Sequence, residues 1–173
     1  RLYYAQELGL LEFADSKTLK DRIPSHLRDS ENEWFGLTKR ARVIMYNKDL
    51  VDPAELSTYE DLATEKWNGQ ISVRSSTNIY NRSLMSSIIA HHGADKATQW
   101  AAAVRGNMAT DPKGNDRDQL KNIVSGTGKI ALANTYYLGL MINSENEAER
   151  EAAASILPFF PNQDGRGAHI NIS

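Results

Sequence analysis

The chain of 173 residues carries 20 lysines and arginines against 22 aspartates and glutamates, so its net charge at pH 7 is only −2. This balance gives no basic footprint for nucleic acid. The chain has no cysteine, which excludes disulfides, zinc–thiolate sites and cysteine nucleophiles. No apolar run approaches the roughly 18 residues of a membrane span. Small ligands and protein partners remain as the classes of binding partner.

The two ends of the sequence both carry patterns that look interrupted. Residues 2–11 have a helical pattern with no capping residue before it, and residues 169–173 alternate like a strand. We therefore expect the sequence to be part of a longer chain. After the first helix, a cap at Asp15 and a short helix to about residue 20 are expected. Residues 34–47 then have the pattern of a long extended segment.

The rest of the chain alternates between strand and helix patterns. A capping box formed by Ser57 and Glu60 predicts a short helix that runs to about Ala63. The elements predicted after it are, in order, a strand at 70–74, a helix at 80–92, a helix at 95–105, a helix at 117–124 capped by Asp116, a strand at 129–133, a helix from 136, a helix at 147–155, an extended segment at 157–161 and a last strand after 167. This alternation predicts an α/β fold with crossover connections between strands.

Three tyrosines lie where a predicted strand gives way to a predicted helix. Tyr80 follows the polar loop 75–78, and Tyr136 and Tyr137 follow the strand at 129–133. In open α/β sheets, ligands bind at the carboxyl ends of strands, where loops meet helix N-termini. A phenolate is a hard anionic donor that suits a trivalent metal, and three of them would neutralise Fe(III). The alternative from the residues alone is that these rings pack at helix starts with their hydroxyls in water.

Two further features could hold an anion. The loop 75–78 offers hydroxyls and backbone N–H groups ahead of a helix, although such groups are commonly capped internally or by water. Strand alternation places Arg40 and Arg42 on one face, where an arginine could bind an anion through two hydrogen bonds or form a solvated strand edge. The carboxylates lie mostly in caps and loops and form no nucleophile–base pair, so the sequence predicts no catalytic residues and no enzyme.

Several segments together resemble the substrate-binding proteins of bacterial ferric-iron ABC importers. The segments are WFGLTKRARV at 34–43, LSTYEDLA at 56–63, SSTNIYN at 75–81, VSGTGKIALANTYY at 124–137 and the strand at 167–173, which together follow the family in order along nearly the whole chain. The resemblance implies a two-lobed clamshell, of which about half is present here. Its parts would be the end of the first lobe at 1–38, a crossing strand at 39–47, the second lobe at 48–165 and a return crossing strand at 166–173.

The resemblance also implies how the protein works. Tyr136 and Tyr137 match the adjacent pair of phenolate ligands, and Tyr80 matches the third tyrosine of members that have one. The implied function is capture of Fe(III) in the cleft between two lobes for delivery to the inner-membrane permease of an ABC importer. The implied protein is a monomer that works in the periplasm, or at the cell surface on a lipid anchor.

A synergistic anion, such as carbonate, is the second expected component of the site. Arg40 matches an arginine that helps to hold this anion, and Thr77, Asn78 and Ile79 align with the loop that cradles it in phosphate-using members. These three side chains depart from the small residues of that loop. The alternative function is a solute-binding protein of the same fold for another small anion or a polyamine, in which the tyrosines line a pocket without a metal.

Overall fold

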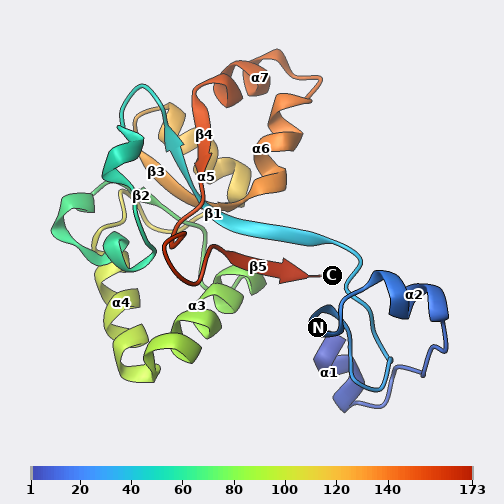
Figure 1. Cartoon of the computed structure of the whole chain (residues 1–173). Helices are drawn as coiled ribbons and strands as arrows, with labels where there is room; N and C mark the ends of the chain where they lie inside the picture. Colours follow the sequence, from blue (N-terminus) through green and yellow to red (C-terminus); the bar gives the residue numbers. More distant parts are fainter. Residues whose placement is uncertain (1, 173) are drawn as a thin grey trace. The chain divides into compact units, whose positions relative to one another are not determined.

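The computed structural model describes residues 2–172, which form two compact units. The first unit consists of the residues up to Arg40 together with those from Ile170 onward, and the second consists of Ala41–His169 (Figure 1). Within the described residues, each helix is too short or too polar to span a membrane. The three predicted tyrosine ligands all belong to the second unit, which is therefore the unit to be understood in detail.

The first unit contains short helices whose ends differ from the sequence-based expectation. They are α1 (Leu2–Glu7), α2 (Lys17–Arg22) and a 3₁₀ helix (Ser25–Leu27). α1 ends four residues earlier than predicted because Gly9 adopts a left-handed conformation, with φ of 64°, and its N–H bonds to the Gln6 carbonyl. The predicted cap at Asp15 is wrong: Ser16 caps α2 by accepting a hydrogen bond from the backbone N–H of Leu19.

The second unit is built on a mixed β-sheet. The strands β1 (Lys39–Asn47), β2 (Ile71–Ser72), β3 (Ile130–Asn134) and β4 (Ile156–Phe159) follow the order β2-β3-β1-β4. β5 (His169–Ile172), whose residues from Ile170 onward belong to the first unit, pairs with β1, which begins in that unit. β2 and β3 are parallel, as a crossover connection requires, but β1 runs antiparallel to both β3 and β4. The extended segment predicted from residue 34 becomes a strand only at Lys39. The α/β class is confirmed, whereas the sheet is less regular than the alternation predicted.

Helices cover both faces of this sheet (Figure 1). They are α3 (Ile79–His92), α4 (Ala94–Gly106), α5 (Asp116–Val124), α6 (Thr135–Ile142) and α7 (Glu147–Ala154), with 3₁₀ helices at Pro53–Glu55, Glu60–Ala63 and Glu65–Trp67. Alternation along β1 sends Ile44 and Tyr46 into a core shared with α3 and α4, and sends Val43 and Met45 into a core shared with α5, α6 and α7. α6 begins directly after β3, and α3 begins after the loop that follows β2.

Local caps set where the site-bearing helices begin. Asn78 is the N-cap of α3 and accepts a hydrogen bond from the Tyr80 N–H at 2.9 Å. Asn115, and not the predicted Asp116, caps α5 in a capping box with Asp118, because Asp116 is the first helical residue and is fully buried.

The capping box predicted near residue 57 is also replaced by other contacts. The hydroxyl of Thr58, and not that of Ser57, accepts a hydrogen bond from the Asp61 N–H at 3.1 Å. The carboxylate of Glu60 does not reach back to the cap, because it accepts hydrogen bonds from the Asn162 amide and pairs with His92. The short helix itself exists, as the 3₁₀ helix Glu60–Ala63.

Tyr59 joins the two chain segments that enter and leave the second unit. Its buried hydroxyl donates to the Arg42 carbonyl and accepts from the His169 N–H at 3.0 Å. Tyr59→Phe is therefore expected to lower the free energy of unfolding by about 1–3 kcal/mol, measured by urea denaturation, because both backbone partners lose a buried hydrogen bond. Tyr46→Phe, in the same core cluster, is the control and should cost less. Equal losses would contradict this role.

The same hydroxyl makes the expected loss depend on pH. Burial raises the pKa of the Tyr59 phenol to about 12, against its ordinary value of 10. A group whose pKa is raised by folding stabilises the protein fully below its unfolded pKa and loses that contribution as the pH rises through its folded pKa. The difference in stability between the wild type and Tyr59→Phe should therefore shrink only between about pH 10 and 12.

Candidate metal centre

The three predicted tyrosines come together at two helix starts. Tyr80 lies in the first turn of α3, and Tyr136 and Tyr137 lie in the first turn of α6, directly after β3. The hydroxyl of Tyr136 donates to the hydroxyl of Tyr80 at 3.3 Å, although the two residues are 56 positions apart. The rings of Tyr136 and Tyr137 are stacked at an angle of 31°, with 4.2 Å between their centroids. All three side chains are partly exposed, so a ligand can reach them.

Burial and the neighbouring phenols both change the pKa of Tyr136. Burial raises the pKa of the Tyr136 phenol far above its ordinary value of 10, and the hydrogen bonds and charges of Tyr137 and Tyr80 raise it further. These neighbours act in that direction because a phenolate beside other phenols that also ionise is repelled by them. A bound trivalent metal reverses the effect, since its charge compensates several phenolates at once. Tyr136 is thus a phenol that a hard cation could convert into an anionic ligand.

Other common metal ligands do not gather in the described part of the chain. Among residues 2–172, no group of three or more histidine, cysteine, aspartate or glutamate side chains is arranged to hold a metal ion.

The four residues expected to hold an anion lie in different parts of the structure. Asn78 uses its side-chain oxygen to cap α3, and Ile79 is the first residue of that helix. The exposed hydroxyl of Thr77 lies 3.0 Å from the hydroxyl of Ser75, within the same loop. The loop thus satisfies part of its own hydrogen-bonding capacity, which is the alternative that the sequence left open. Arg40 is the last residue of the first unit before β1 enters the second, and it is partly buried.

Arg42 has a different environment from the one that strand alternation suggested. It is fully buried, and its Nη1 forms an ion pair with Asp116 Oδ2 at 2.7 Å. Its Nη2 donates to Asn81 Oδ1 at 2.6 Å and to the Leu132 carbonyl at 3.0 Å. The expectation of a solvated strand edge at Arg42 is therefore wrong. A signal was present in the sequence, because Arg42 lies between Ala41 and the apolar run Val43–Met45, and a buried arginine needs a polar partner.

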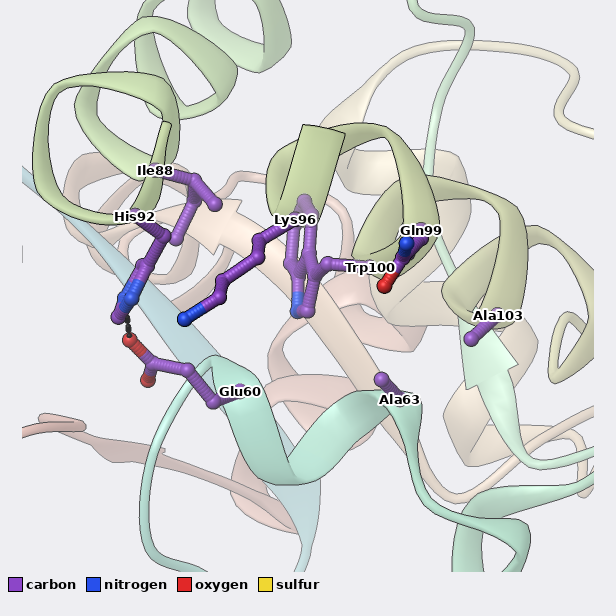
Figure 2. A pocket seen from close by; sticks show the side chains of 8 residues that line it. All are labelled: Glu60, Ala63, Ile88, His92, Lys96, Gln99, Trp100 and Ala103. Carbon is purple, nitrogen blue, oxygen red and sulfur yellow. Dashed lines mark hydrogen bonds and ion pairs between the residues drawn. The ribbon is translucent and has the colours of Figure 1, made fainter. Parts of the chain in front are cut away.

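Two pockets lie elsewhere on the second unit, and neither is lined by the tyrosines. The pocket in Figure 2 has a volume of about 360 Å³ and lies between α3, α4 and the 3₁₀ helix at Glu60. His92 and Glu60 close one side of it through a contact of 2.6 Å between Nε2 and Oε1, beside the ring of Trp100 (Figure 2). Burial acts to raise the pKa of Glu60, but the hydrogen bonds from Asn162 and His92 outweigh it and lower that pKa.

The second pocket, of about 410 Å³, lies between α3 and α4 on the side of the loop 74–76. Its lining is mostly apolar, from Leu84, Trp100 and Val104 among others, with the polar groups of Arg74 and Asn81 at one wall. Its lining includes Asn81, the residue after Tyr80 in the first turn of α3.

The chain belongs to the bacterial extracellular solute-binding protein family, whose family model matches residues 4–159. The similar relatives with established names are iron-uptake proteins. The chain is 46% identical over 173 residues to iron uptake protein A1 of Synechocystis, a match that covers 100% of this chain and 48% of that protein. It is 43% identical to iron uptake protein A2 of the same organism, over 99% of this chain and 50% of that protein. The chain thus spans about half the length of the curated relatives it matches.

Solved structures agree with this assignment. A Trichodesmium protein, IdiA or FutA, in complex with iron and citrate has a TM-score of 0.95 and 52% identity, over 99% of this chain and 54% of that one. The ferric binding protein of Campylobacter jejuni has a TM-score of 0.95 and 49% identity, over 99% and 55%. These comparisons confirm the predicted resemblance and the predicted fold class. The relatives are solute-binding transport proteins and not enzymes, as the lack of a nucleophile–base pair indicated.

Proposed function

We propose that the protein containing this chain captures ferric iron for an ABC importer, and that Tyr80, Tyr136 and Tyr137 are its phenolate ligands on this part of the chain. The observation that carries the proposal is the contact of 3.3 Å between the hydroxyls of Tyr136 and Tyr80. Residues 56 positions apart meet there through their hydroxyl groups, which are the atoms that would bind a metal. The iron-binding relatives support the same cargo.

The chemistry of the donors favours Fe(III) over softer or less charged metals. Phenolate oxygens are hard donors, and three of them balance the three positive charges of the ion. Further coordination positions would be filled by donors outside this chain and by a synergistic anion of the carbonate class. Arg40, Thr77, Asn78 and Ile79 are the proposed anion-binding residues, because the N-terminus of α3 presents a favourable end of the helix dipole to an anion.

The place of the chain in the whole protein is part of the same proposal. Residues 48–165 would form the second lobe of a two-lobed binding protein, residues 1–38 the end of its first lobe, and residues 39–47 and 166–173 the strands that cross between the lobes. The protein would work as a monomer in the periplasm, or at the cell surface on a lipid anchor, and would deliver iron to an inner-membrane permease. Membership of the extracellular solute-binding family supports this setting.

The test is an Fe(III) titration of the full-length protein, followed by visible absorption. The wild type is expected to form a coloured complex with one iron per protein, because phenolate-to-iron charge transfer absorbs visible light. Tyr136→Phe and Tyr137→Phe should abolish the band, and Tyr80→Phe should weaken both the band and the affinity. Tyr4→Phe changes an exposed tyrosine of α1 and is the control that should bind as the wild type does.

The alternative function predicts a different result. A solute-binding protein for another small anion or a polyamine would give a flat, colourless titration with iron. An organic anion or polyamine bound in its cleft would then identify the cargo. A colourless wild type, or a band that survives in both Tyr136→Phe and Tyr137→Phe, would overturn the proposed ligands.

A further inference from the structure

A buried polar cluster is hydrogen-bonded to residues at the starts of the two helices that carry the tyrosines. At its centre is the guanidinium of Arg42, which is fully buried on β1. One of its nitrogens pairs with Asp116 at 2.7 Å, and another donates to Asn81 at 2.6 Å. Asp116 is also fully buried, at the start of α5. These three residues come from three separate elements that the core brings together.

The first arm of this cluster ends at Tyr80. Asn81 follows Tyr80 in the first turn of α3 and uses every polar atom of its side chain. Its oxygen accepts from Arg42, and its nitrogen donates to the Arg74 carbonyl at 2.7 Å and to the Ser75 carbonyl at 3.2 Å. The first turn of α3 and the loop before it are thus held to one point of β1.

The second arm ends at Tyr136. Asp116 Oδ2, which binds Arg42, also accepts from the backbone N–H of Asn134 at 3.3 Å. Asn134 is the last residue of β3 and the N-cap position of α6, two residues before Tyr136. A continuous series of hydrogen bonds therefore joins the start of the helix that carries Tyr80 to the start of the helix that carries Tyr136.

The composition of the cluster favours a geometric role over a purely stabilising one. Burying an arginine and an aspartate costs desolvation energy, and an apolar replacement of similar volume is often as stable. Within the described residues, Arg42 Nε has no hydrogen-bond partner, and Asp116 Oδ1 has only a longer ion pair, with Arg74 at 3.7 Å. The planar guanidinium of Arg42 holds its hydrogen-bond partners Asp116 and Asn81 at a fixed separation. An apolar side chain could not do this.

We propose that Arg42, Asp116 and Asn81 are positioning residues, which hold the hydroxyls of Tyr80 and Tyr136 close together before the metal arrives. The inference rests on the proposed function, because it assigns these residues to the same site. Ligands that are already in place lose less conformational freedom when iron binds, and the affinity gains accordingly. None of the three residues would touch the iron, so each acts through a tyrosine.

The test uses Asn81→Ala in the full-length protein, which removes the first arm and keeps the buried ion pair. Changes in residues that orient metal ligands typically cost about 10–100-fold in metal affinity, and we expect a loss of about 10-fold for Fe(III). In a Tyr80→Phe background the same change should cost less than about 2-fold, because coupled residues are not additive. Asn107→Ala is the matched control, since buried Asn107 also donates two hydrogen bonds to backbone carbonyls, at Leu62 and Thr64.

A crystal structure of the iron-free Asn81→Ala protein separates this inference from the proposed function. The distance between the Tyr80 and Tyr136 hydroxyls, 3.3 Å here, should increase. An unchanged distance, or an equal loss of affinity with and without Tyr80, would overturn the positioning role even if the wild type forms the coloured complex. A colourless wild type would instead overturn the proposed function, while the distance still decides the positioning. If Asn81→Ala does not fold, Asn81→Ser is expected to show the same effects more weakly.

Discussion

Asp116→Ala is expected to lower the free energy of unfolding by about 3–5 kcal/mol, because it leaves the guanidinium of Arg42 buried without a counter-charge. Both side chains of this ion pair are fully buried, at a separation of 2.7 Å. A net stability of 5–15 kcal/mol is usual for a protein, so this single change removes a large share of it. Urea denaturation of the full-length protein, followed by tryptophan fluorescence, measures the loss. Asp116→Asn retains the shape of the side chain and should lose less.

The control for this prediction is another aspartate–arginine pair in the same unit. Asp111 pairs with Arg105 at 2.5 Å, but their side chains are 70% and 54% exposed. Solvent-exposed pairs contribute about 0–1 kcal/mol, so Asp111→Ala should scarcely change stability. The double replacement Arg42→Met with Asp116→Leu should recover part of the loss, because it removes both charges of the pair. Recovery is incomplete because Asn81, the Leu132 carbonyl and the Asn134 N–H lose their hydrogen-bond partners. Similar losses in Asp116→Ala and Asp111→Ala would contradict the account of the buried pair.

Local signals were sufficient to place the tyrosines. Strand patterns followed by polar residues predicted that Tyr80 and Tyr136 begin helices, and the structure has both in a first helical turn. Each of these patterns spans only a few residues, so the sequence next to each tyrosine is enough to predict the helix start. The meeting of Tyr80 with Tyr136 could be anticipated only from the rule that ligand sites form at the ends of strands, because it joins residues 56 positions apart.

The buried cluster could not be derived in the same way. Arg42 and Asp116 are 74 positions apart, and nothing near either residue indicates the other. Asp116 has the sequence pattern of a helix cap, but Asn115 takes that position and leaves the Asp116 carboxylate to point into the core. Because the cap lies one residue earlier than predicted, the carboxylate of Asp116 is buried and does not lie at the surface. The exact ends of helices are the features that local sequence pattern predicts least accurately.

Sheet topology was the other feature that local pattern could not supply. The alternation of strands and helices predicted crossover connections, and β2 and β3 do form a parallel pair. β1 instead lies between β3 and β4 and runs antiparallel to both. Its apolar run, with buried residues on both faces, is typical of any central strand. Whether β3 and β4 run parallel or antiparallel to β1 depends on the path of the chain between these distant strands.

Iron affinity is expected to rise steeply with pH, because each phenol must lose a proton to become a ligand. Burial, followed by the neighbouring phenols Tyr137 and Tyr80, raises the pKa of Tyr136, so this residue is protonated at neutral pH without a metal. Below the phenol pKa values, each proton displaced adds about a tenfold gain in affinity per pH unit. The three proposed phenolate ligands would therefore give up to about 1000-fold per pH unit, and acidification should release the iron.

The proton count can be measured directly and compared between variants. Proton uptake or release on iron addition is followed in weakly buffered solution with a pH indicator. The useful quantity is the total number of protons released per iron, because one binding event would displace the protons of all the proposed ligands. Tyr80→Phe should release about one proton fewer than the wild type, and taking this difference cancels the protons that come from hydrolysis of free iron. Tyr4→Phe should leave the count unchanged. An equal proton count in the wild type and in Tyr80→Phe would remove Tyr80 from the ligand set, even if its loss weakened binding by other means.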